Sequence, residues 1–256
     1  MEQADSTAID VLIKGKGWVA VNKPAGLLVH ESAYSGPAPA TALSILRKQL
    51  RRKQLHAVHR LDSATSGVLL VAFDEDTAQG LAKQFEARET EKTYLVIVRG
   101  YAPAEGEIDR PLPGAQLGSP ARPALTRFKT MARIELPIPV DKFPVSRYSL
   151  VEVRPETGRH HQIRRHFKVL AHPIIGDVQY GKGDHNRVFR QNYDVHRLML
   201  HAWKLKFRDP ATGEETMVEA PVDDSWTRAL KIFGDAGRLD RPPPAPEGAE
   251  ATAQAA

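Results

Sequence analysis

The longest unbroken apolar run in the chain, residues 68–73, is only six residues long. It is rich in β-branched residues, and its length suits a buried strand. A helix that spans a membrane needs about 20 apolar residues, so we expect no membrane span and no membrane partner. The N-terminus has neither a basic start nor an apolar segment and does not resemble a secretory signal. We therefore expect a cytoplasmic protein built from short elements.

Strand patterns and helical patterns follow one another irregularly. Besides the apolar run, strands are predicted at residues 18–21, 94–98, 148–154 and 198–207. Helices are predicted after Asp74 or Asp76, over about residues 160–171, and after Asp223 or Asp224. Residues 103–123 are rich in Pro and Gly and are expected to form a long surface loop or a pair of turns. This order favours an α+β fold with a mixed, mostly antiparallel sheet and flanking helices.

The two ends of the chain differ from its middle in composition. Residues 1–9 are mostly polar and are expected to fray. Residues 242–256 are rich in Pro and Ala and contain no large apolar residue, which predicts a disordered tail. No internal repeat is visible. Residues 10–241 are therefore expected to form a single domain.

The net charge of +5 is distributed unevenly. From Asp209 onward, ten acidic residues against four basic ones give −6, so the first 208 residues carry +11. Much of it comes from two clusters: Arg47, Lys48, Arg51, Arg52, Lys53 and Arg60, and then Arg154, Arg159, Arg164, Arg165 and Lys168. Such clusters are typical of proteins that bind nucleic-acid phosphates, although a solvated basic surface is the alternative. We expect the backbone contacts to come from Arg47, Arg51, Arg52, Arg159 and Arg165.

The chain contains no Cys, which excludes disulfides, thiolate nucleophiles, iron–sulfur clusters and cysteine-ligated zinc. His160, His161 and His166 lie close together, but they lack the i, i+4 spacing of a helical metal pair. Their run contains no carboxylate, and its Arg and Lys side chains would repel a dication. We therefore expect no metal and no cofactor.

The most informative stretch, residues 59–67, has the sequence His-Arg-Leu-Asp-Ser-Ala-Thr-Ser-Gly and leads into the buried strand. Its single carboxylate, Asp62, is expected to be held on a rigid scaffold yet open to a cleft. A turn-forming or N-cap role is the alternative for an Asp in this position. Because no Cys and no obvious Ser-His-Asp arrangement is present, Asp62 is the best-placed catalytic candidate.

A second polar stretch begins at Thr157 and Gly158 and leads into the helix predicted over residues 160–171. Its first turn is crowded with hydrogen-bond donors. The N-terminus of a helix with free donors binds anions, so this turn is a predicted phosphate site.

Together these motifs resemble the large pseudouridine synthase family typified by RluA. The residues that carry the resemblance, in order, are Asn22 to Gly26, His59 to Gly67, Lys92 to Tyr94, Thr157 to Arg164 and Arg197 to Ala202. The likeness covers about residues 10–235. It implies a catalytic domain with a central cleft that isomerises uridine to pseudouridine in RNA without a cofactor or a metal.

The resemblance also implies roles for individual residues. Asp62 would be the carboxylate that starts cleavage of the glycosidic bond, either by attacking the sugar or by removing a sugar proton. Arg60 would fill the gap that the flipped uridine leaves, Tyr94 would pack on the extruded base, and Arg164 would pair with Asp62. Leu198 or Leu200 would form a wall of the pocket.

Residues 172–187 resemble a branch of the family that modifies tRNA, which points to a uridine of the T-arm stem, at tRNA position 65. The matching residues begin almost at the N-terminus, so we expect no small basic RNA-binding module before the catalytic domain, and a monomer that binds tRNA or another structured RNA. Two alternatives remain: a ribosomal RNA pseudouridine synthase, and a non-catalytic basic RNA-binding protein of the same fold. A pure binder would not need Asp62 among basic residues.

Overall fold

In a computed structural model of the chain, residues 8–31, 40–116 and 118–239 are described. The predicted tail at 242–256 lies outside these residues, as do residues 1–7 of the segment expected to fray. Ile9 contradicts the predicted boundary of that segment, because its side chain is buried and its backbone N–H and C=O both bond to Gln49. Ordered structure therefore begins before residue 10.

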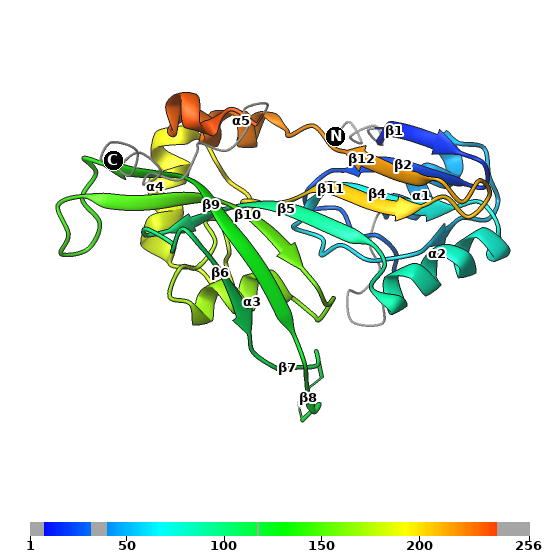
Figure 1. Cartoon of the computed structure of the whole chain (residues 1–256). Coiled ribbons are helices and arrows are strands. Elements are labelled where there is room, and N and C mark those ends of the chain that lie inside the picture. The colour runs from blue at the N-terminus through cyan, green and yellow to red at the C-terminus, as the bar shows by residue number, and fades with distance from the viewer. Residues whose placement is uncertain (1–7, 32–39, 117, 240–256) are drawn as a thin grey trace, which may run out of the picture.

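Most strands of the described chain join one sheet of ten strands (Figure 1). In spatial order its main path is β1 (Asp10–Gly15), β2 (Trp18–Lys23), β4 (Ser66–Ala72), β11 (Leu200–Arg208), β5 (Glu91–Arg99), β10 (Ser146–Pro155), β9 (Leu125–Leu136) and β6 (Glu105–Asp109). Off this path, β12 (Glu215–Glu219) pairs with β11, and β3 (His56–Ala57) pairs with β4. Every pairing in the sheet is antiparallel except that of β4 with β11. The α+β prediction with a mixed, mostly antiparallel sheet is confirmed.

The strands β2 and β4 are buried on both faces, which explains why they have continuous apolar sequences. Val19 and Val21 of β2 pack with Leu46 of α1 (Ala42–Gln49) on one face. Trp18 and neighbouring side chains pack with Leu81 of α2 (Glu75–Ala87) on the other face. Because successive side chains of a strand point to opposite faces, each strand contributes to two cores.

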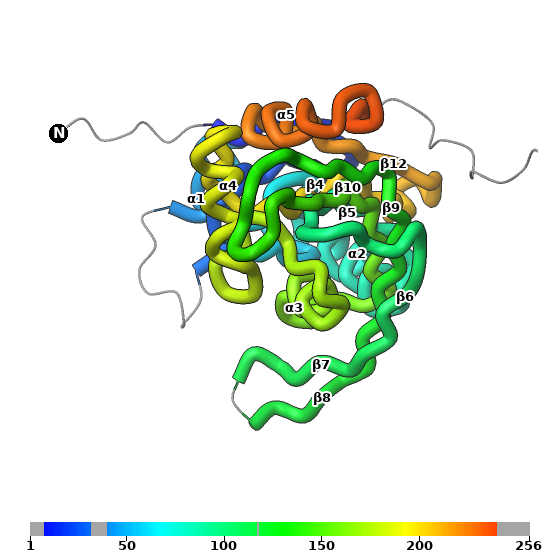
Figure 2. The backbone as a smooth tube through the Cα atoms, turned by 90° about the vertical axis from the view of Figure 1, so that its left-hand side faces the viewer, coloured from blue at the N-terminus to red at the C-terminus, as the bar shows by residue number. Residues whose placement is uncertain are grey.

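A third core fills the half of the molecule around β5, β9 and β10. There α3 (Gln162–Val169) and α5 (Asp224–Lys231) lie on opposite sides of the sheet (Figures 1 and 2). They contribute Phe167 and Trp226, both fully buried. Residues 148–151 of β10 are consequently all buried, rather than alternating as a strand with one exposed face would.

Strands β1, β9 and β12 and helix α1 were not predicted from the sequence, and two further regions also differ from the predictions. Residues 183–193 form a helix, α4 (Gly183–Tyr193), that was not predicted, because only the adjacent Val188 and Phe189 are buried and no apolar periodicity results. The Pro- and Gly-rich segment 103–123, predicted as a loop or turns, contains β6 and a separate hairpin of β7 (Leu112–Pro113) and β8 (Ala121–Arg122). Figure 2 shows this hairpin projecting from the body of the protein.

The only parallel pairing in the described sheet, that of β4 with β11, joins the two halves and depends on a glycine. Gly67 has φ +110°, and a Cβ atom there would lie 2.1 Å from the carbonyl oxygen of Ala202. Only glycine permits this approach, which sets the position of the loop that precedes β4 and carries Asp62. Among the described residues, no helix has the length and apolar composition needed to cross a membrane.

Candidate active site

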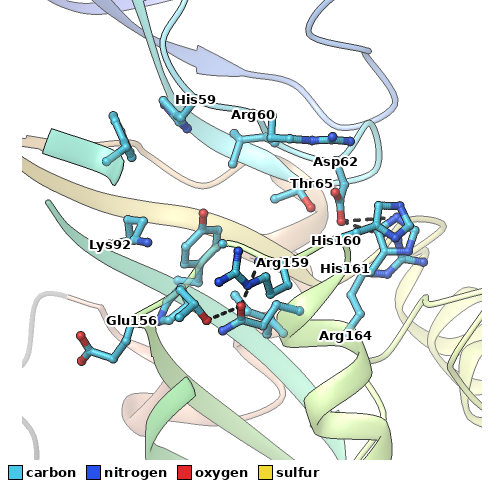
Figure 3. A pocket seen from close by; sticks show the side chains of 18 of the residues that line it. His59, Arg60, Asp62, Thr65, Lys92, Glu156, Arg159, His160, His161 and Arg164 are labelled. Atoms are coloured by element: carbon cyan, nitrogen blue, oxygen red, sulfur yellow. Dashed lines mark hydrogen bonds and ion pairs between the residues drawn. The ribbon is translucent and has the colours of Figure 1, made fainter. Parts of the chain in front are cut away.

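A pocket of about 540 Å³ lies where the two halves of the sheet meet. Four segments line it: the loop before β4, the C-terminal half of α2, the start of β5, and the connection from β10 to α3. Leu200 of β11 also lines it. Figure 3 shows the side chains of these segments converging. The volume is in the range of pockets that bind small molecules.

Asp62 lies on the loop before β4, and its side chain is 20% exposed in the pocket. The loop is held by backbone hydrogen bonds, in which Thr65 N–H donates to Asp62 O at 3.0 Å and Gly26 N–H donates to Ser63 O at 2.7 Å. The ammonium of Lys23 is buried beneath it and donates to Ser63 O at 3.1 Å. Asp62 is thus an accessible carboxylate on a rigid loop, as predicted.

Two nitrogen-bearing side chains face the Asp62 carboxylate (Figure 3). Arg164 Nη1 and His161 Nε2 each lie 3.7 Å from Asp62 Oδ2. These distances are longer than hydrogen bonds. The structure therefore brings Asp62 and Arg164 together as a charge pair, but their contact is not the strongest one that Arg164 makes.

The strongest partner of Arg164 is Asp177. Its Nε and Nη2 donate to the two carboxylate oxygens of Asp177 at 2.7 and 3.0 Å. Both side chains are buried. The prediction that Arg164 pairs with Asp62 is therefore incomplete, because a second carboxylate holds the guanidinium from the other side.

His161 is neutral near physiological pH. Burial lowers its pKa to about 4, while Asp62 acts in the opposite direction. The residue has φ +52°, immediately before α3, and its ring stacks on His160 at a centroid distance of 3.7 Å. Its Nδ1 lies 3.1 Å from the hydroxyl of Tyr180. The contact of His161 with Asp62 is consequently not an ion pair at neutral pH.

Tyr94 and Leu200 form apolar walls of the pocket. Burial raises the pKa of Tyr94, and Asp62 raises it further, so the ring is a neutral phenol. Leu198, the other candidate for a wall, does not line the pocket and is buried in the core. Of the two leucines that the sequence left open, Leu200 is the one at the site.

At the predicted phosphate site around Thr157 and Gly158, two of the donors form hydrogen bonds within the protein. Helix α3 begins at Gln162, whose side-chain oxygen accepts hydrogen bonds from the Thr157 hydroxyl at 2.6 Å and the Arg159 N–H at 2.9 Å. These donors are therefore occupied by the protein itself, and the turn serves to connect β10 to α3.

The predicted backbone-contact residues lie in two places. Arg159 lines the pocket, whereas Arg165 donates to Pro113 O in the projecting hairpin at 2.8 Å. Arg60, predicted instead to fill the gap that the uridine leaves, is exposed and also lines the pocket. Arg47 is exposed in the last turn of α1, Arg51 and Arg52 are exposed just after it, and Arg52 lies 4.3 Å over the ring of Phe73. Phe73 and the pocket lie at opposite ends of β4, a strand about 20 Å long.

Within the described part of the chain, no three His, Asp or Glu side chains are grouped so that they could hold a metal ion. His166 illustrates why, because its two ring nitrogens lie 2.9 Å from Thr126 Oγ1 and 3.0 Å from Arg110 O. It links α3 to the sheet and does not face the pocket.

Sequence reasoning did not single out Lys23, Asp177 and Tyr180 as site residues, although each contacts a group around Asp62. Lys23 and Asp177 lie within the sequence motifs that carry the family resemblance, and this was the one signal that could have identified them. Neither spacing nor residue type indicated that they would lie below and behind Asp62.

Comparison with known proteins agrees with this geometry. Residues 17–169 match the RNA pseudouridylate synthase family. The chain is 40% identical over 234 residues to tRNA pseudouridine synthase C of Vibrio parahaemolyticus, covering 88% of this chain and 95% of the relative. It is 42% identical to the protein of the same name from Pasteurella multocida, covering 88% and 96%.

Solved structures show the same fold. Human RNA pseudouridylate synthase domain containing 1 superimposes with a TM-score of 0.67 at 25% identity, covering 87% of this chain and 86% of that one. Domain containing 4 superimposes with a TM-score of 0.69 at 23% identity, covering 88% and 92%.

The fold and the site therefore define an isomerase that acts on RNA. It belongs to the RNA pseudouridylate synthase family, whose members convert uridine in RNA into pseudouridine. The resemblance stated from the five motifs is confirmed.

Proposed function

We propose that this protein isomerises a uridine in the T-arm stem of tRNA, at position 65, and that Asp62 is its catalytic carboxylate. The observation that carries the chemistry is the placement of Asp62, 3.7 Å from Arg164, in a pocket walled by Tyr94. The choice of tRNA is supported by relatives named tRNA pseudouridine synthase C that match 88% of the chain.

The chemistry requires that the bond between the sugar and N1 of the base be broken and a new bond from the sugar to C5 be formed, so the base must leave the helical stack. Flipping costs a few kcal/mol. Stacking of the uracil on Tyr94 would return about 1–3 kcal/mol. Because the neutral ring of Tyr94 lines the same pocket as Asp62, the stacked base would place its glycosidic bond near the carboxylate.

In this proposal the neighbouring residues have separate roles. Asp62 starts cleavage of the glycosidic bond, and Arg164 supplies a positive charge beside it. Arg60, exposed at the edge of the pocket, enters the space that the flipped uridine vacates. Leu200 completes the apolar wall.

Two groups of cations would bind the RNA backbone. Arg159 and Arg165 lie by the β10–α3 connection, and Arg47, Arg51 and Arg52 lie at the end of α1 and just after it, where Arg52 packs on Phe73 at the far end of β4 from the pocket. Contacts to phosphates position a structured RNA without reading its sequence. A folded tRNA could therefore be held at both places by its shape.

Residues 10–241 would act as one catalytic domain, since a single sheet extends through both halves of the described chain. In this proposal the protein acts as a monomer. The proposed site of action is the cytoplasm, where tRNA is the substrate.

The direct test is release of tritium from RNA that carries uridine labelled at C5, with tRNA and ribosomal RNA assayed in parallel. Release from tRNA is expected. Pseudouridines would then be mapped in cells that lack the protein, and loss of one T-arm modification is expected. Loss from ribosomal RNA with every tRNA position intact would overturn the assignment of the substrate, and no release from either RNA would favour a non-catalytic binder.

A further inference from the structure

The segment from Gly176 to Gly181 lies behind the pocket, on the side of Arg164 away from Asp62. Asp177 is its only carboxylate, and the side chain is fully buried. Burial opposes ionisation, but hydrogen bonds from Arg164 and from the Tyr180 N–H hold the pKa of Asp177 below its ordinary value. A buried charge of this kind is maintained only where its partners are well arranged.

The contacts of Asp177 account for both of its oxygens. Arg164 bonds to both in a bidentate pair, and the N–H groups of Gln179 and Tyr180 donate to Oδ1 at 2.9 Å each. Arg164 therefore has two of its donor groups fixed, and its remaining Nη1 faces Asp62 at 3.7 Å. A planar guanidinium held by two bonds cannot rotate, so the direction of Nη1 is set by Asp177.

The turn itself is fixed by α4. Asn186 accepts a hydrogen bond from Gly176 N–H at 2.8 Å and donates to Asp177 O at 3.1 Å. Gly181 N–H also donates to Asp177 O, and a Cβ atom on Gly181 would lie 2.1 Å from that oxygen. The backbone of Asp177 is thus held independently of its side chain.

From this chain of contacts we infer that Asp177 is a positioning residue, which orients Arg164 toward Asp62 and is itself held in place by Asn186 of α4. The inference rests on the proposed role of Asp62 in the reaction. Through Asn186 it assigns a function to the segment of residues 172–187 that resembles the tRNA-modifying branch.

Asp177→Asn is the informative variant. Its amide oxygen can still accept from the Gln179 and Tyr180 N–H groups, while the charge and one acceptor for Arg164 are lost. We expect kcat to fall about 10- to 100-fold, because a displaced group near the reacting bond has effects of that size. KM for the RNA should change less than about threefold, since Asp177 is buried and does not face the RNA. Asn186→Ala should lower kcat in the same direction by a smaller factor.

The matched control is Asp209→Asn. Asp209 is also a buried Asp in a turn, accepting from Trp18 Nε1 at 2.9 Å and Ala211 N–H at 2.7 Å, but it lies outside the pocket. This variant should lower the melting temperature without changing kcat. Equal effects of Asp177→Asn and Asp209→Asn on kcat at matched stability would show a merely structural role and overturn the inference.

A double variant tests whether Asp177 acts through Arg164. Arg164→Met with Asp177→Asn leaves no buried charge unpaired, and its kcat should equal that of Arg164→Met alone. Multiplication of the two losses would overturn the inference. The assay uses whichever RNA the unmodified protein converts, so failure of tRNA as substrate would leave this test intact.

A measurement without RNA completes the test. Hydrogen exchange of the Arg164 Nε–H, followed by NMR, should be slow in the unmodified protein and about 10-fold or more faster in Asp177→Asn, because the group loses its partner at 2.7 Å. Unchanged exchange would show that Asp177 does not hold Arg164, whatever the activity.

Discussion

The buried ammonium of Lys23 donates a hydrogen bond to the carbonyl oxygen of Ser63, the residue that follows Asp62. Its other bonds go to the carbonyl oxygens of Pro24 and Leu27 at 2.9 and 2.8 Å. The end of β2 is thereby tied to the loop that presents the carboxylate. Burial, with a smaller contribution from the charge of Arg197, lowers the pKa of Lys23 to about 7.

This lowered pKa predicts a pH-dependent stability. Unfolding returns the pKa of Lys23 to its ordinary value of 10.5, so between about pH 7 and pH 10.5 the unfolded chain binds more protons than the folded one. The contribution of Lys23 to the free energy of unfolding therefore rises with pH across that window, by up to about 1.4 kcal/mol per pH unit. The destabilising effect of the buried charge is greatest below pH 7.

The measurement is denaturant unfolding of the unmodified protein and of Lys23→Met at about pH 7.5 and 9.5. Their difference in free energy of unfolding should shift by roughly 2 kcal/mol in favour of the unmodified protein at the higher pH. A difference that does not change with pH would contradict the assignment.

Asp62→Asn is expected to abolish turnover while RNA affinity stays within severalfold. The substitution keeps the size of the side chain but removes the charge that starts cleavage, so a loss of about 10³-fold or more is expected. Tritium release measures turnover, and fluorescence anisotropy with labelled RNA measures affinity. Substantial pseudouridine formation by the Asn variant would remove Asp62 from its proposed role.

Activity is expected to need no metal ion bound to the protein. The His and carboxylate groups of the described residues form no metal-binding cluster, and His161 and His166 have protein partners. A chelator should therefore slow the reaction only through RNA folding, and adding magnesium back should restore the rate. Stoichiometric zinc in active protein, found by elemental analysis, would contradict this expectation.

Arg51→Ala with Arg52→Ala should reduce the dependence of RNA binding on salt. If both guanidinium groups contact phosphates, the slope of log K against log salt should become less steep by about one or two. The matched control removes Lys204 and Lys206 instead, since both are already paired with Glu side chains of the protein. Identical slopes for the two double variants would place Arg51 and Arg52 away from the RNA.

A mismatch opposite the target uridine in a tRNA transcript should speed the reaction. In a stem the base must be unpaired before it flips, and a mismatch removes part of that cost. Single-turnover rates on paired and mismatched transcripts provide the comparison, with a mismatch elsewhere in the same stem as control. A slower reaction at the mismatched target would indicate that the enzyme requires the intact stem.

Local sequence was sufficient to predict β2, β4, β5 and β10, because their apolar residues must be buried and their length suits strands. It failed for α4, whose buried residues are the adjacent Val188 and Phe189, and for the strand and hairpin within residues 103–123, whose Pro and Gly content indicated a loop. The motif around Asp62 indicated the catalytic candidate because its single carboxylate directly precedes a buried strand and the chain has no Cys and no obvious Ser-His-Asp arrangement.

The arrangement around that carboxylate depended on contacts between distant parts of the chain. Lys23 reaches Ser63 across 40 residues, and Arg164 reaches Asp177 across 13, where the rest of α3 and the turn after it intervene. Spacing along a strand or helix predicts only neighbours within the same element. Which carboxylate holds Arg164, and which leucine lines the pocket, were therefore determined by the packing of β11, α3 and α4 around the Asp62 loop, since only the folded chain brings these groups to within bonding distance.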